Sequence, residues 1–195
     1  VCTDLVCRMS VSWTTGRAGM IDYQIGNLID QGKKGNVQVI AHCANCMNTM
    51  KSGIAPQIVN AFPYAAEADK QTVRGDREKL GTFSLGIAEP EDYDLLGYNC
   101  PDVFNLYGQY GFTKRQLGQR DLDYDAIYNA LEGMAFKLVD WGAEDLNIGL
   151  PALGCGLAGA KWRIIEAMIE ETVCLTDNRV VVFSLSKEAQ DALLR

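Results

Sequence analysis

Short apolar segments of strand character alternate with segments of helical period along most of this chain. The strand segments are residues 21–25, 37–42, 80–88, 102–107, 146–150 and 179–185, and the helical segments are residues 54–62, 65–79, 124–139 and 162–174. Such alternation predicts an α/β fold, in which helices sandwich a mixed, mostly parallel sheet. Residues 65–79 are expected to be a solvated helix, and Pro63 is expected to stop the helix before it.

The patterned sequence predicts one domain over residues 20–195, since no internal repeat or second domain interrupts it. Residues 1–19 show no clear period and no continuous apolar leader. We expect them to form a poorly ordered tail or an upstream extension.

Charge and cysteine content narrow the partners of the protein. The net charge is −7 and the sequence pI is about 4.7, which argues against a general grip on nucleic acid. No apolar run approaches the length of a membrane span. The seven cysteines are odd in number and irregularly spaced, so we expect reduced thiols in the cytoplasm. A monomer without metal or cofactor is expected.

Ligands of such sheets bind beyond the carboxyl ends of the strands, and one loop there is rich in glycine. Residues 154–159 read GCGLAG, follow a predicted buried strand and precede a predicted helix. This context is typical of a loop whose backbone binds phosphate. A dinucleotide site is disfavoured, because the next strand, residues 180–185, carries no acidic residue. The alternative is a glycine turn that only permits tight packing.

Three stretches resemble the ligand loops of the macro domain family. Residues 150–162 (LPALGCGLAGAKW) resemble its second ligand loop, His42 to Cys46 with Gly53 to Ala55 resemble its first, and Gly26 to Leu28 resemble the turn after its first strand. The resemblance covers residues 21–186 and implies a single macro domain that binds ADP-ribose. It is closest to the branch that removes phosphate from ADP-ribose 1″-phosphate, and to the related branch that cleaves terminal ADP-ribose from proteins, in phage and bacterial forms.

The resemblance implies a place along the ligand for each residue of these loops. The adenine would lie near Gly26, Asn27 and Leu28, with Asp22 as a weaker candidate, and the distal ribose near Asn45, Lys51, Ser52, Gly53, Ile54 and Ala55. The diphosphate would lie against Gly154, Cys155, Gly156, Leu157, Ala158 and Gly159, and the distal end near Tyr107 and Gln109.

Three functions remain open at this point. The first is hydrolysis of ADP-ribose 1″-phosphate to ADP-ribose and phosphate, and the second is non-enzymatic reading of ADP-ribose. The third, removal of ADP-ribose from proteins, is disfavoured. The lysine and aspartate of that branch correspond by motif position to Gln109 and Ala158, which cannot form a lysine adduct or act as a carboxylate base.

His42, the one histidine of the chain, is the candidate catalytic residue. It would shuttle a proton or orient a water, since the phosphatase branch has a histidine at this point. The alternative is a buried, hydrogen-bonded histidine that shapes the loop. Asp121 and Asp123 are candidates for activating the water. Zinc binding by His42, Cys43 and Cys46 is disfavoured, because the remaining cysteines are scattered singly.

Overall fold

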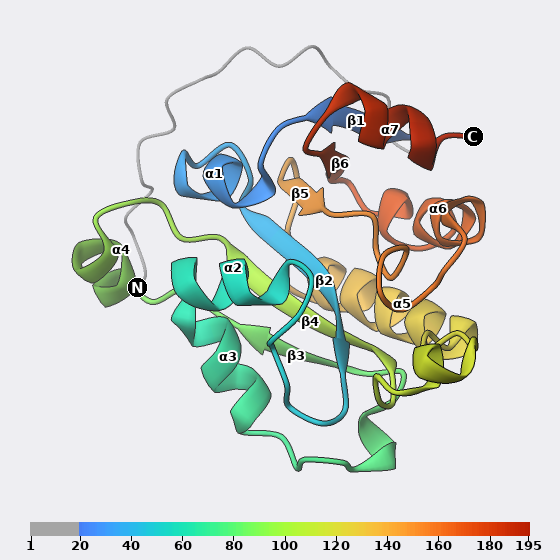
Figure 1. The fold of residues 1–195 in the computed structure, drawn as a ribbon. Coiled ribbons are helices and arrows are strands. Elements are labelled where there is room, and N and C mark those ends of the chain that lie inside the picture. The colour runs from blue at the N-terminus through green and yellow to red at the C-terminus, as the bar shows by residue number, and fades with distance from the viewer. Residues whose placement is uncertain (1–19) are drawn as a thin grey trace.

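Six strands form one sheet in the computed structural model, which describes residues 20–195 (Figure 1). Their order across the sheet is β1-β6-β5-β2-β4-β3. Five strands run parallel, and β3 pairs antiparallel with β4 at one edge. The strands are β1 (Ile21–Ile25), β2 (Val39–Asn45), β3 (Phe83–Gly86), β4 (Asp102–Gln109), β5 (Asn147–Leu150) and β6 (Arg179–Ser184). The predicted α/β fold class is confirmed.

Residues 20–195 also form seven α-helices and three short 3-10 helices, all of which lie between strands except the last α-helix. The α-helices are α1 (Leu28–Lys33), α2 (Ala55–Ala61), α3 (Pro63–Lys70), α4 (Pro90–Leu96), α5 (Tyr124–Asp140), α6 (Trp162–Glu170) and α7 (Lys187–Leu193). The 3-10 helices are Arg77–Lys79, Lys114–Leu117 and Val173–Leu175. None of the helices in this part of the chain is long and apolar enough to cross a membrane.

Two apolar cores lie on the two faces of the sheet, because side chains alternate along each strand. Helices α1, α2 and α3 cover one face, where Ile40, Val103 and Val181 are buried among their side chains (Figure 1). Helices α5 and α6 cover the other face, over Val39 and Phe104. The strands are therefore fixed in register, and the carboxyl ends of the five parallel strands lie at one edge of the sheet.

The structure departs from the expected helices around α3. Pro63 follows α2 directly and is also the first residue of α3. Proline is tolerated there because the backbone N–H it lacks would have no partner in the first turn of a helix. The expected helix over residues 65–79 ends at Lys70. Its solvated character is wrong at three positions, since Ala65, Asp69 and Lys79 are buried. The prediction for residues 1–19 lies outside the described residues.

Candidate functional site

The strands that follow β2 and β5 lie on opposite sides of this neighbouring pair in the sheet. After β2 the chain continues to β3 and β4 on one side, and after β5 it continues to β6 on the other. Because β2 and β5 are neighbours, their carboxyl ends form the topological switch point at which open α/β sheets bind ligands. Two predicted segments follow these ends: residues 46–53, here the β2 loop, and residues 154–159, here the glycine loop.

The glycine loop presents backbone rather than side chains. Gly154 and Gly159 have φ of 66° and 78°, in the left-handed region that favours glycine. A Cβ on Gly154 would lie 2.6 Å from Leu122 Cδ1, whereas one on Gly156 would meet nothing within 4 Å. Among residues 20–195, no protein acceptor pairs with the amides of Gly156 and Leu157. These amides are available to an anion, next to the N-terminus of α6.

The β2 loop is shaped by the side chain of Asn45. Its Oδ1 accepts hydrogen bonds from Met47 N (2.9 Å) and Thr49 Oγ1 (3.0 Å), and its Nδ2 donates to Thr49 O (2.9 Å). Lys51, Ser52 and Gly53 are exposed beyond this turn, and Ile54 and Ala55 lead into α2. The structure thus assigns Asn45 to holding the loop, with residues 51–53 facing solvent.

The turn after β1 lies at the same edge of the sheet, but Asp22 does not. Gly26 N donates to Ser184 O (2.8 Å), and the Asn27 side chain caps α1 by accepting from Ile29 N (2.9 Å). Leu28 is buried in the core beside this turn. Asp22 lies four residues before Gly26, near the start of β1, and forms an ion pair with Arg179 at the start of β6. The carboxylate of Asp22 is therefore set apart from the other predicted site residues.

Tyr107 and Gln109 lie at the end of β4, beside Asn45. Gln109 pairs with Asn45 in the sheet, and its Nε2 donates to Gly111 O (2.8 Å). Tyr107 is completely buried, and its hydroxyl hydrogen-bonds with Asp69 Oδ1 and Ser84 Oγ, both at 2.8 Å. Burial raises the pKa of Tyr107 well above its usual value. Gln109 is partly exposed here, whereas the phenol of Tyr107 is enclosed.

His42 lies inside the protein. It is 1% exposed, and its Nε2 is 2.7 Å from Asn105 Oδ1. Asn105 Nδ2 in turn donates to Ala65 O (2.9 Å) and Ser84 Oγ (3.0 Å). Burial lowers the pKa of His42 below 6.5, although the bond to Asn105 acts in the opposite direction. This arrangement favours a neutral histidine that shapes the end of β2 over one that contacts a ligand.

Asp121 and Asp123 both use their carboxylates to start helices. Asp121 is 6% exposed, and its two oxygens accept from Lys114 N (2.9 Å) and Arg115 N (3.3 Å). Asp123 Oδ1 caps α5 by accepting from Asp125 N (3.0 Å) and Ala126 N (3.1 Å). An acidic residue directly before a helical pattern is a capping signal, and it was visible in the sequence at Asp123.

The structure adds residues that the sequence reasoning missed. Asp69 and Lys79 form a buried ion pair, and Lys79 donates to the half-buried Asn48 of the β2 loop. No local pattern predicts it, because these residues lie far apart in the chain. Two apolar side chains are exposed at the carboxyl ends of strands. Ile25, the last residue of β1, is 54% exposed, and Leu185, directly after β6, is 74% exposed.

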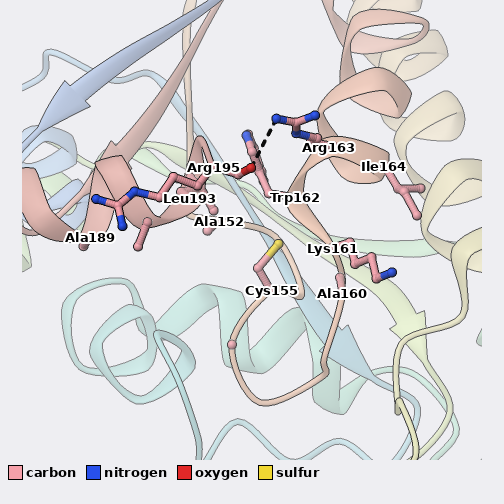
Figure 2. A pocket seen from close by; sticks show the side chains of 12 residues that line it. Ala152, Cys155, Ala160, Lys161, Trp162, Arg163, Ile164, Ala189, Leu193 and Arg195 are labelled. Atoms are coloured by element: carbon pink, nitrogen blue, oxygen red, sulfur yellow. Dashed lines mark hydrogen bonds between the residues drawn. The ribbon is translucent and has the colours of Figure 1, made fainter.

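A cavity of about 600 Å³ lies on the side of the glycine loop that faces α6 and α7 (Figure 2). Its lining combines Ala152, Cys155, Gly156 and residues 160–164 with Ala189, Ala192, Leu193 and Arg195. Arg163 Nη2 donates to Arg195 O at 3.2 Å across it (Figure 2). Burial raises the pKa of Cys155 to about 11, so its thiol stays protonated near neutral pH. The cavity shares Cys155 and Gly156 with the predicted site, while the β2 loop does not line it.

Metal ligands do not gather at this edge of the sheet. Among residues 20–195, no group of three or more His, Cys, Asp or Glu side chains is placed to hold a metal ion. Cys43 and Cys46, considered with His42 in the sequence, are free thiols. Burial raises the pKa of Cys43 to about 12.

Relatives of the chain in sequence include a phage protein and a human enzyme. No family model matches the chain. An uncharacterized 17.5 kDa protein of Enterobacteria phage T4 is 36% identical over 135 residues, which are 67% of this chain and 77% of the phage protein. The human ADP-ribose glycohydrolase OARD1 is 33% identical over 79 residues, or 40% of this chain. That match spans half the length of the human enzyme.

Solved structures give a wider match. A Bacteroides thetaiotaomicron protein of unknown function has a TM-score of 0.69 at 26% identity, covering 86% of this chain and 99% of that one. The macrodomain of Mycobacterium tuberculosis DarG has a TM-score of 0.61 at 18% identity, with the same coverage. Thermosipho africanus DarTG, solved in complex with ADP-ribose, has a TM-score of 0.63 at 17% identity, covering 90% of this chain and 46% of that one.

The sheet order, the helices on both faces and these structural matches define an α/β protein with the macro domain fold. The predicted macro domain is therefore confirmed as a fold. Within that class, the chain belongs to one family with the 17.5 kDa protein of phage T4.

Proposed function

We propose that this protein binds ADP-ribose and ADP-ribose 1″-phosphate at the carboxyl ends of β2 and β5, and that it hydrolyses the 1″-phosphate. The observation that carries the proposal is the glycine loop at the switch point, where the amides of Gly156 and Leu157 have no acceptor among residues 20–195. Oriented amides beside a helix N-terminus bind phosphate without a basic side chain, which suits an acidic protein.

The relatives support this class of ligand. DarTG of Thermosipho africanus was solved with ADP-ribose, and OARD1 is an ADP-ribose glycohydrolase. In our proposal the glycine loop holds the diphosphate, and residues 51–53 of the β2 loop lie along the distal ribose. The exposed side chains of Ile25 and Leu185 offer an apolar surface to the adenine, beside the turn that begins at Gly26.

A second candidate function is non-enzymatic reading of ADP-ribose, and specific contacts favour it. His42 is buried against Asn105, and the carboxylates of Asp121 and Asp123 already accept backbone hydrogen bonds. Phosphatase activity therefore requires a water-activating group other than these three in their present positions. Removal of ADP-ribose from proteins stays disfavoured by Gln109 and by Ala158, which is 7% exposed.

Calorimetric titration of ADP-ribose, followed by a phosphate-release assay on ADP-ribose 1″-phosphate, tests the proposal. Gly156→Asp places a carboxylate at the free amides, and the open space there allows the protein to fold. Gly156→Asn is the matched control of equal size. We expect the aspartate to weaken ADP-ribose binding more than tenfold and the asparagine to weaken it much less.

Each outcome of these assays has a defined meaning. Binding with phosphate release supports the phosphatase, and binding without release supports the reader. If the wild-type protein does not bind ADP-ribose, both functions are rejected. Equal affinities of the two Gly156 variants would place the diphosphate elsewhere.

A further inference from the structure

A buried ion pair lies next to the β2 loop. Lys79 Nζ and Asp69 Oδ1 are 3.7 Å apart, and the two side chains are only 7% and 4% exposed. Burying charges is costly, and a buried pair is seldom the most stabilising choice for its volume. Its presence here calls for a reason other than the stability of the core.

The ammonium group of Lys79 holds the β2 loop directly. It donates to Asn48 Oδ1 at 2.8 Å and to the Cys46 carbonyl at 3.4 Å. It also lies 4.3 Å from the centre of the Tyr107 ring, within the range of a cation–π contact. Both hydrogen-bond acceptors belong to the loop, whereas Lys79 lies more than 30 residues later, in the segment that leads into β3.

Asn48 is the turn residue through which Lys79 acts on the loop. Its φ is 51°, in the left-handed region, which asparagine enters more readily than other residues apart from glycine. Its side chain bridges two segments: Oδ1 accepts from Lys79, and Nδ2 donates to Thr72 Oγ1 at 3.1 Å and to the Asp69 carbonyl. The turn of the β2 loop is thus bonded through Asn48 to Lys79 and to the segment of residues 69–72.

We infer that Lys79 is a positioning residue for the β2 loop, which holds residues 46–49 through Asn48 and the Cys46 carbonyl so that residues 51–53 are placed for ligand. The ligand part of this inference rests on the proposed function. Lys79 is 6% exposed, so it acts through the loop rather than by contact with ADP-ribose. Asp69 keeps the ammonium in place and is itself held by the Tyr107 hydroxyl.

The test compares two variants with a core control. Lys79→Met removes the hydrogen bonds to the loop. The double variant Asp69→Asn with Lys79→Met removes the same bonds without leaving a buried charge unpaired, so it serves if the single variant fails to fold. Leu138→Ala, in the core on the opposite face of the sheet, lowers stability without touching either loop.

Hydrogen exchange and ligand titration are the two measurements. We expect amide exchange in residues 46–53 to become at least tenfold faster in both Lys79 variants, and exchange in the glycine loop to stay unchanged. ADP-ribose should bind at least fivefold more weakly, while Leu138→Ala changes neither the β2 loop exchange nor the affinity. If amide exchange in the β2 loop of the Lys79 variants equals that of the wild-type protein, the inference is overturned. It is also overturned if Leu138→Ala loses affinity for ADP-ribose to the same extent. Because exchange needs no ligand, it tests the role of Lys79 even if ADP-ribose does not bind.

Discussion

The two loops at the switch point are held in opposite ways. The glycine loop is held by backbone: Gly154 packs against Leu122 in a left-handed conformation, and the Ala158 carbonyl accepts from the amides of Asp121 and Leu122, both at 3.1 Å. The β2 loop is held by side chains, with Asn45 bonding inside the loop and Lys79 bonding to it from a distant segment.

The two loops differ in whether their conformation is fixed mainly by their own residues or by residues from distant segments. The glycine loop takes much of its conformation from its own glycines, which enter the left-handed region freely, and the distant residues 121 and 122 bond to it only through their backbone amides. The conformation of the β2 loop depends on a buried ion pair contributed by α3 and by the 3-10 helix before β3. The two loops should therefore respond to different substitutions.

The largest effect is expected at Asp69. Asp69→Ala leaves the Lys79 ammonium buried without its carboxylate, which should lower the free energy of unfolding by about 3–5 kcal/mol. Urea denaturation measures it. Glu67→Ala, on the same helix, is the control, because its pair with Lys70 is exposed and such pairs contribute about 0–1 kcal/mol. Similar losses in the two variants would show that the buried pair contributes no more to stability than the exposed one.

A smaller loss is expected in the glycine loop. Gly154→Ala forces an L residue to φ near 66° and places its Cβ against Leu122 Cδ1. The two costs together predict a loss of about 2–4 kcal/mol. Gly156→Ala, with open space around its Cβ, should change stability by no more than about 0.5 kcal/mol. If thermal unfolding shows the reverse order, the glycine loop is not held as described.

The smallest effect concerns pH and His42, in the middle of β2. Its pKa is lowered in the folded state, so below pH 6.5 the unfolded chain takes up a proton that the folded protein does not. Stability should then fall as the pH drops from 6.5, by at most about 2 kcal/mol at about pH 5. His42→Gln should remove this part of the slope, as followed by thermal unfolding against pH. Parallel slopes for the two proteins would mean that His42 titrates normally in the fold.

The strands were predictable because their signal is local. All six predicted strand segments overlap observed strands, since apolar residues cluster over short stretches in each. Helices α1, α4 and α7 were missed. Helix α4 has no buried residue and so no apolar stripe, while α1 has only six residues and depends on the Asn27 cap.

The candidate site was predictable in its loops and less so in its side chains. The glycine loop follows from its composition, and the structure places it at the switch point. The enclosure of His42 follows from a neighbour, since Ile40 on the same face of β2 lies in the core beneath α1, α2 and α3. The pair of Asp69 and Lys79 could not be predicted, because two segments separated in sequence meet only once the sheet is assembled.

The direction of one edge strand decides where Lys79 lies. Because β3 is antiparallel to β4, Phe83 at its start faces Leu106 near the carboxyl end of β4. The residues that enter β3 therefore arrive at the same edge of the sheet as the β2 loop. A parallel strand here would begin at the opposite edge, roughly 10 Å away at about 3.3 Å per residue. A redesign that reversed the direction of β3 would thus move Lys79 away from the β2 loop, even with the sequences of the loop and of the Lys79 segment unchanged.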